Sequence, residues 1–151
     1  PSTVDPSRLR ARIGTSHVLY RHRALVGATL TEATTGAALA GQRVMLRSRV
    51  RNHAYATVAT LTTSARGVVR YVVRPSQTTY YRWVYAGTAT NQKVISATLR
   101  LTVMARVAAG LSPHVVSPGA FAMVWGRVAP GVAGQRVWLQ RRVHGTWHTL
   151  H

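Results

Sequence analysis

The sequence contains no cysteine and only two acidic residues, Asp5 and Glu32. Without cysteine the chain has no disulfide and no thiolate metal site. Two isolated acids argue against a calcium site, which needs several oxygen ligands, and against catalysis by paired carboxylates. No apolar run approaches the roughly 20 residues that a membrane-spanning helix requires, so we expect no membrane span.

Motifs that carry catalysis are also missing. The sequence has no Gly-x-Ser-x-Gly nucleophile turn and no phosphate-binding or dinucleotide-binding glycine loop. Seven histidines raise the question of a metal site. His144 and His148 would lie about 13 Å apart on one strand, which is too far for one ion. We therefore expect no catalytic residues, no metal, no cofactor and no enzymatic activity.

The charge balance is strongly one-sided. Twenty lysines and arginines face the two acids, which gives a formal net charge of +18, and every cation except Lys93 is an arginine. Such a field attracts nucleic acid, anionic cell-wall polymer, acidic polysaccharide or lipid headgroups. A GC-rich genome with an arginine-rich proteome explains the same bias without a binding role. Both interpretations remain open from the sequence.

Short runs rich in Val, Thr, Tyr and Leu recur between turn residues, while helical periodicity is weak throughout. This pattern predicts an all-β protein. We expect strands at roughly 16–21, 23–32, 42–50, 54–63, 67–74, 78–86 and 93–104, and then at 113–117, 120–128, 135–143 and 146–150.

Alternation within these runs predicts which side chains face a core, because neighbouring residues of a strand point to opposite faces. The arginines fall mostly on the opposite, solvated face, as in an antiparallel sandwich, and Ser96 is expected there too. The inward sets are Val44, Leu46 and Val50; Val69, Tyr71 and Val73; Tyr81, Trp83 and Tyr85; and Ile95, Ala97, Leu99, Leu101 and Val103.

One segment occurs twice. "AGQRVMLRSRV" (residues 40–50) and "AGQRVWLQRRV" (residues 133–143) share Ala-Gly-Gln-Arg-Val, a later Leu and a final Arg-Val. Their surroundings also correspond, so we interpret them as copies of one duplicated module. The second copy lacks equivalents of the strands at 67–74, 78–86 and 93–104. The expected organisation is an N-terminal extension at 1–15, a β-sandwich at 16–107 and a partial second domain at 108–151.

Two stretches carry a family resemblance. "TTSARGVVRYVVRPSQTTYYRWVYAG" (residues 62–87) and "GRVAPGVAGQRVWLQRRVHGTWHTL" (residues 126–150) resemble the repeated Ig-like, fibronectin-type-III-like modules of secreted actinobacterial proteins. The resemblance implies an Ig-like antiparallel β-sandwich followed by a partial Ig-like repeat. It also implies an extracellular or cell-surface location and a non-catalytic structural or adhesion role, usually within a larger secreted protein.

The partial repeat leads to the first functional hypothesis. Half a sandwich leaves strand edges unpaired, and such edges invite pairing with another chain. A cut chain, a disordered tail and completion by a neighbouring subunit are all open. The third would make the protein a filament or surface-layer subunit that assembles with itself. The residues expected at this assembly edge are Val137, Leu139, Val143 and Trp147.

The alternative hypothesis is a basic module that binds nucleic acid or anionic wall polymer. No recognised reading module is present, so we expect salt-sensitive binding without sequence specificity. The candidate polyanion-binding residues are Arg43, Arg47, Arg49, Arg51, Arg70, Arg74, Arg82, Arg136 and Arg142.

Overall fold

The computed structural model describes residues 4–150 and confirms an all-β protein. A membrane-crossing helix is absent from this described part of the chain. The chain divides into two compact units, Pro1–Arg106 and Val107–His151.

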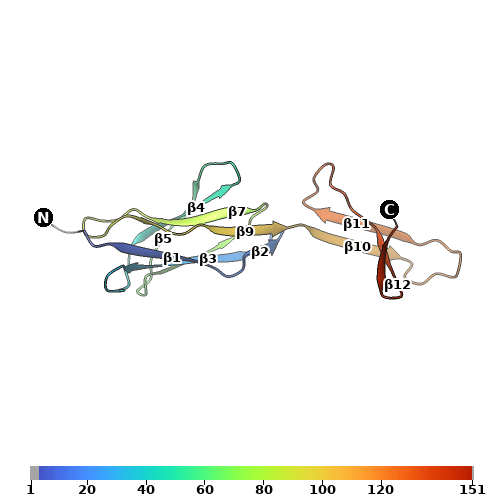
Figure 1. Ribbon diagram of the computed structural model, residues 1–151, viewed down its shortest axis with the longest axis horizontal. Helices are drawn as coiled ribbons and strands as arrows, with labels where there is room; N and C mark the ends of the chain where they lie inside the picture. Colours follow the sequence, from blue (N-terminus) through green and yellow to red (C-terminus); the bar gives the residue numbers. More distant parts are fainter. Residues whose placement is uncertain (1–3, 151) are drawn as a thin grey trace. The chain divides into compact units, whose positions relative to one another are not determined.

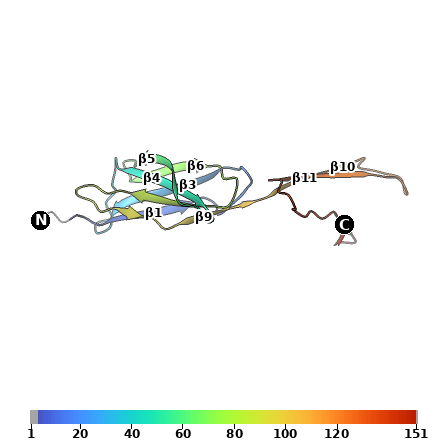
Figure 2. The ribbon, with the colours of Figure 1, turned by 90° about the horizontal axis from the view of Figure 1, so that it is seen from above.

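The first unit contains two sheets. Strands β1, β3 and β6 form one, and the other has the order β2-β9-β7-β4-β5, with β8 pairing to β7 (Figures 1 and 2). Pairing is antiparallel apart from the parallel pair β2 and β9. The strands are β1 (Ser7–Ile13), β2 (His17–Leu19), β3 (Ala24–Glu32), β4 (Arg43–Val50), β5 (Ala56–Thr62), β6 (Val68–Val73), β7 (Thr79–Tyr85), β8 (Val94–Ile95) and β9 (Leu99–Met104).

The core of this unit is formed by the inward side chains of both sheets. Its fully enclosed residues are Val26 and Leu30 from β3, Val44 and Leu46 from β4, Trp83 from β7 and Leu101 from β9. The predicted inward orientation of Tyr81, Trp83 and Tyr85 is confirmed, since each is at most 4% exposed. Large aromatic side chains therefore supply much of the apolar area that holds the two sheets together.

The N-terminal segment differs from expectation. Residues 1–15 were expected to be an extension, but β1 pairs with β3 from Ser7 to Ile13. Residues 1–3 lie outside the described part of the chain. The physical reason is a period-two pattern in which Leu9 is buried and the arginines beside it are exposed. β1 is thus an edge strand of the three-stranded sheet.

The single strand expected at 93–104 is also corrected. The structure breaks it into β8 and β9. Next to the break, the buried and the exposed side chains are the opposite of those predicted. Ser96 is buried whereas Ile95 is 47% exposed. The buried Ser96 hydroxyl accepts a hydrogen bond of 2.9 Å from the backbone N–H of Trp83. Satisfying that buried donor favours the inward serine, because an unpaired buried N–H is costly.

The second unit contains two small sheets. Strand β10 (Arg106–Ser112) pairs with β11 (Met123–Ala129), and β12 (Gln140–Val143) pairs with β13 (Thr146–Thr149). The strand expected at 113–117 does not form. The strand expected at 135–143 is shorter than predicted, so Val137 and Leu139 precede it, and they are 60% and 42% exposed. Both side chains are exposed because neither residue lies in a paired strand within the described part of the chain.

The two copies of the repeated segment share a turn but differ in their surroundings. Gly41 and Gly134 occupy the same position in the repeat and both have a positive φ, of 67° and 78°, which favours glycine. The first copy continues into β4, which lies between β5 and β7. There the Gln42 side chain accepts a hydrogen bond from the buried Tyr85 hydroxyl. Within residues 4–150, the strand in the second copy, β12, pairs with β13 alone.

Candidate polyanion interface

Arginines gather on the outer face of the sheet that contains β4 and β7. Arg47 lies directly opposite Arg82, and Arg49 lies opposite Tyr80. Val44 and Leu46 of β4 are fully buried on the inner face, so the alternate residues of that strand must point outward. Side chains opposite one another on antiparallel strands lie within contact distance. The fold therefore concentrates positive charge at this place.

Tyrosine rings separate these guanidinium groups. The Cζ of Arg82 lies 3.8 Å from the centre of the Tyr55 ring, and the Cζ of Arg49 lies 5.2 Å from the centres of both Tyr55 and Tyr80. Arg47 donates a hydrogen bond of 2.8 Å to the Tyr55 backbone carbonyl. The electron-rich ring faces attract the cations and stabilise their close approach. We call Arg47, Arg49, Tyr55, Tyr80 and Arg82 the arginine–tyrosine cluster.

The positive charge of the cluster is left without a protein carboxylate. The whole chain has two acidic side chains. Glu32 accepts a hydrogen bond from Thr35, and Asp5 lies in a bridge with Asn91. The Nε atoms of Arg47, Arg49 and Arg82 are buried and have no hydrogen-bond partner within the described residues, so they do not themselves face solvent. An external anion is the natural counter-charge for such a group.

The electrostatics of the cluster appear in the pKa of Tyr55. Partial burial by itself raises this pKa. The hydrogen bond with Thr98 and the positive charges of Arg49 and Arg82 outweigh that effect, so the pKa is lowered from the ordinary 10.0. Tyr81, on the inner face of the same sheet, shows the opposite behaviour, because burial raises its pKa. The outer face thus favours negative charge and the inner face does not.

The structure disperses the other predicted arginines. Arg70 and Arg74 do not lie on a strand adjacent to that of Arg82. β6 pairs with β3 in the other sheet, so Arg70 is on a different sheet from Arg82. The remaining positions are Arg43 at the start of β4, Arg51 just after β4, Arg74 just after β6, Arg136 before β12 and Arg142 within β12; all of these side chains are exposed.

The sequence interpretation missed several residues of the basic surfaces. Arg8, Arg10 and Arg12 are exposed on β1. Their strict alternation with Leu9, Ala11 and Ile13 was the signal that could have found them. The role of Tyr55 had no comparable signal, because it lies between β4 and β5 and contacts β7 only through the tertiary fold.

The residues of the predicted assembly edge lie in the second unit. Val137, Leu139 and Trp147 are exposed, and Val143 is half-buried in β12. The first two line a shallow apolar groove. Its walls are Val107, Ala109, Val124, Trp125, Gly126, Val137, Trp138 and Leu139.

A metal site is not evident in residues 4–150, where no three histidine or acidic side chains lie close enough to share an ion.

Comparison with known proteins gives few matches. No family model matches the chain, and no curated protein matches it. Among solved structures, one similar chain is a superoxide reductase (neelaredoxin) from Ignicoccus hospitalis. It has a TM-score of 0.46 and 10% identity, and the match covers 63% of this chain and 80% of that one.

This neighbour contradicts the prediction that the chain is not an enzyme, because the protein found is an enzyme. We therefore withdraw that prediction. With so low a TM-score, the likeness carries no argument for a particular reaction in this chain.

Proposed function

We propose that the first unit is an Ig-like module that binds the phosphodiester backbone of an anionic polymer through the arginine–tyrosine cluster. The observation that carries the proposal is the gathering of Arg47, Arg49 and Arg82 on one outer sheet face without a carboxylate partner. Guanidinium groups bind phosphate oxygens with paired, charge-assisted hydrogen bonds.

The Ig-like type is supported by the strand order. In Ig domains the first, second and fifth strands share one sheet, and the third, sixth and seventh share the other. Without the short strands β2 and β8, β1, β3 and β6 are the first, second and fifth strands, and β4, β7 and β9 are the third, sixth and seventh. The fourth, β5, pairs with β4 rather than joining the sheet of β1. The resemblance of residues 62–87 to actinobacterial modules supports a place at the cell surface.

The cluster favours backbone binding over base recognition. A protein that stacks nucleic-acid bases needs a free aromatic face. Arg82 and Arg49 lie against the Tyr55 ring, and Arg49 also contacts Tyr80. The rings thus serve to position the cations. Nucleic acid and a polyol-phosphate wall polymer share the phosphodiester chemistry that these cations recognise.

The test is salt-dependent binding of a fluorescent oligothymidylate and of polyglycerol phosphate. The variant Arg47→Gln/Arg49→Gln/Arg82→Gln is compared with Arg23→Gln/Arg74→Gln/Arg106→Gln, which loses the same charge from exposed positions. About 0.7 counterions are released per phosphate contact with a single strand, so the first variant should lower the slope of log K against log salt by about 2.

The matched control should change the slope much less. Equal slopes in the two variants would overturn the cluster as the binding site. Tighter binding of polyglycerol phosphate than of oligothymidylate at equal charge would identify wall polymer as the source of the phosphodiester, and the reverse would identify nucleic acid.

A second candidate function is self-assembly through the second unit, as a structural or adhesion subunit. It is supported by the burial of the repeated segment. Leu46 of β4 is fully buried in the core of the first unit, whereas its counterpart Leu139 is 42% exposed. An isolated two-stranded sheet is marginally stable, so pairing with added strands would stabilise this unit. We propose that a second molecule of the same protein supplies the added strands, since two identical molecules present the same unpaired strand edges.

Sedimentation over a range of protein concentrations tests this assembly. The chain should associate at high salt, where repulsion between basic copies is screened. Val137→Arg should weaken the association, and Val115→Arg, at a position that is 86% exposed and outside the groove, should not. A chain that stays monomeric at every concentration would exclude this function.

A further inference from the structure

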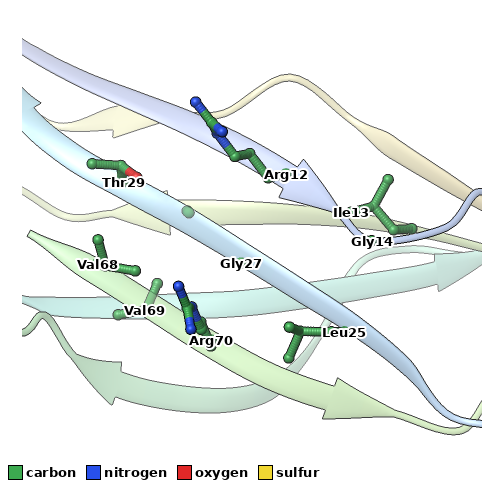
Figure 3. Close-up of a pocket in the computed structure, with 10 residues that line it drawn as sticks. Arg12, Ile13, Gly14, Leu25, Gly27, Thr29, Val68, Val69 and Arg70 are labelled. Atoms are coloured by element: carbon green, nitrogen blue, oxygen red, sulfur yellow. The ribbon is translucent and has the colours of Figure 1, made fainter.

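Two arginines flank a glycine on the outer face of the other sheet of the first unit. Arg12 of β1 and Arg70 of β6 are both in register with Gly27 of β3 (Figure 3). Neighbouring strands lie about 4.8 Å apart, which places the Cα atoms of the two arginines about 9 to 10 Å from each other. Both arginine side chains are exposed.

Gly27 has no side chain between these arginines, and the place where a Cβ would lie is already 2.9 Å from the Val69 carbonyl oxygen and 3.6 Å from Arg70 Cγ. The residues around it line a groove of about 470 Å³, whose rim includes Thr29 and Leu25. The next outward row along β3 places Thr29 between Arg10 and Val68. Gly27 and Thr29 are the outward residues of β3 that pair with both β1 and β6. Of these two, Gly27 has an arginine as its partner on each side. Neither Asp5 nor Glu32 lines the groove.

We infer that this groove is a second site for a phosphodiester group, which is held between the guanidinium groups of Arg12 and Arg70. Two long, flexible side chains based about 9 to 10 Å apart can both reach one tetrahedral oxyanion with hydrogen bonds of about 2.8 Å. The groove of about 470 Å³ between them gives the anion room above the sheet.

The position of the groove makes the module bivalent. The core lies between the two sheets and is built from Val26 and Leu30 on one side and Leu46 and Trp83 on the other. The outer faces therefore point away from each other. The arginine–tyrosine cluster occupies one and the Gly27 groove the other, so one copy can hold two polymer strands and cross-link them. This bridging role rests on the proposed function, whereas the groove itself does not.

The groove is tested alone with inorganic phosphate, followed through the backbone amide signal of Gly27 in nuclear magnetic resonance spectra. The signal should shift and saturate in the wild-type chain and in the Arg47→Gln/Arg49→Gln/Arg82→Gln variant. It should lose most of its shift in Arg12→Gln/Arg70→Gln. The control Arg8→Gln/Arg74→Gln removes the same charge from β1 and from the residue that follows β6, and it should behave as wild type. No saturable shift, or an equal loss in the control, would overturn the site.

Bridging is tested by energy transfer between donor-labelled and acceptor-labelled oligothymidylates. The same measurement is made with donor-labelled and acceptor-labelled polyglycerol phosphate. Wild-type protein should bring the two labels together and bind two oligomers per chain. Arg12→Gln/Arg70→Gln should bind one oligomer and give no transfer. Two oligomers bound by that variant would overturn bridging through the groove. One oligomer bound by the Arg47→Gln/Arg49→Gln/Arg82→Gln variant would support the groove as a separate site. If that variant bound oligomer as tightly as wild type, the proposed function of the arginine–tyrosine cluster would be overturned while the groove would stand.

Discussion

The guanidinium carbon of Arg82 lies 3.8 Å from the centre of the Tyr55 ring, although the two residues belong to separate parts of the chain. Arg49 approaches the same ring at 5.2 Å. One tyrosine thus contacts two cations that would otherwise repel each other. This relationship explains how a strongly basic sheet face forms on a stable β-sandwich.

Replacing Tyr55 should therefore destabilise the first unit through the arginines. Tyr55→Leu removes both cation–π contacts, each worth about 0.5–1 kcal/mol at exposed sites, so the free energy of unfolding should fall by about 1–2 kcal/mol. Tyr55→Phe keeps the ring and should cost much less. Urea titration followed by the indole signal of Trp83 measures both. Equal losses in the two variants would show that the ring does not hold the cations.

The ionisation of Tyr55 should depend on Arg49. The folded pKa of Tyr55 lies below 10.0, so ionisation favours the folded state; this contribution is present above pH 10 and is lost as pH falls through the folded pKa. Arg49→Gln should raise the pKa. Carbon-13 shifts of labelled tyrosine against pH measure this. Tyr81, whose pKa is raised by burial, serves as the internal control and should not follow the substitution.

The two copies of the repeated segment should respond differently to the same substitution. Leu46 is fully buried, so Leu46→Ala should lower the stability of its unit by about 2–5 kcal/mol. Leu139 is 42% exposed, and Leu139→Ala should change stability by about 0.5 kcal/mol or less in the isolated chain. Hydrogen exchange of amides in each unit separates the two effects. A large loss for Leu139→Ala in dilute protein would mean that this side chain is buried in solution.

Ser96 should matter for stability in spite of its small size. Ser96→Ala leaves the buried N–H of Trp83 without its side-chain acceptor, at a cost of about 1–3 kcal/mol. Ser64→Ala is the matched control, since its exposed hydroxyl accepts backbone N–H groups that water can also reach. Thermal unfolding compares the two. Similar melting temperatures would indicate that the loop around Ser96 rearranges to satisfy Trp83.

Local pattern was enough for most of the strands and much of the core. Alternation predicted Tyr81, Trp83 and Tyr85 inside and Arg47 and Arg49 outside, because side chains on a strand must point to opposite faces. The same rule failed at Ser96. There the strand breaks and a buried hydrogen bond decides which side chain turns inward.

For β1, the sequence pattern predicted the strand only in part. Its alternation of arginine with Leu9, Ala11 and Ile13 is as regular as that of any strand, yet its position at the start of the chain led to its interpretation as an extension. Only the pairing with β3 gives these residues a sheet.

By itself the sequence determined an all-β chain of extreme positive charge, a duplicated segment, and the inward aromatic residues, since composition and period-two alternation are local properties. The tertiary structure decided which arginines meet. It placed Arg82 beside Arg47 rather than beside Arg70, and it set Arg12 and Arg70 on either side of Gly27. Strand neighbours and register depend on contacts between distant parts of the chain, and no local pattern specifies them.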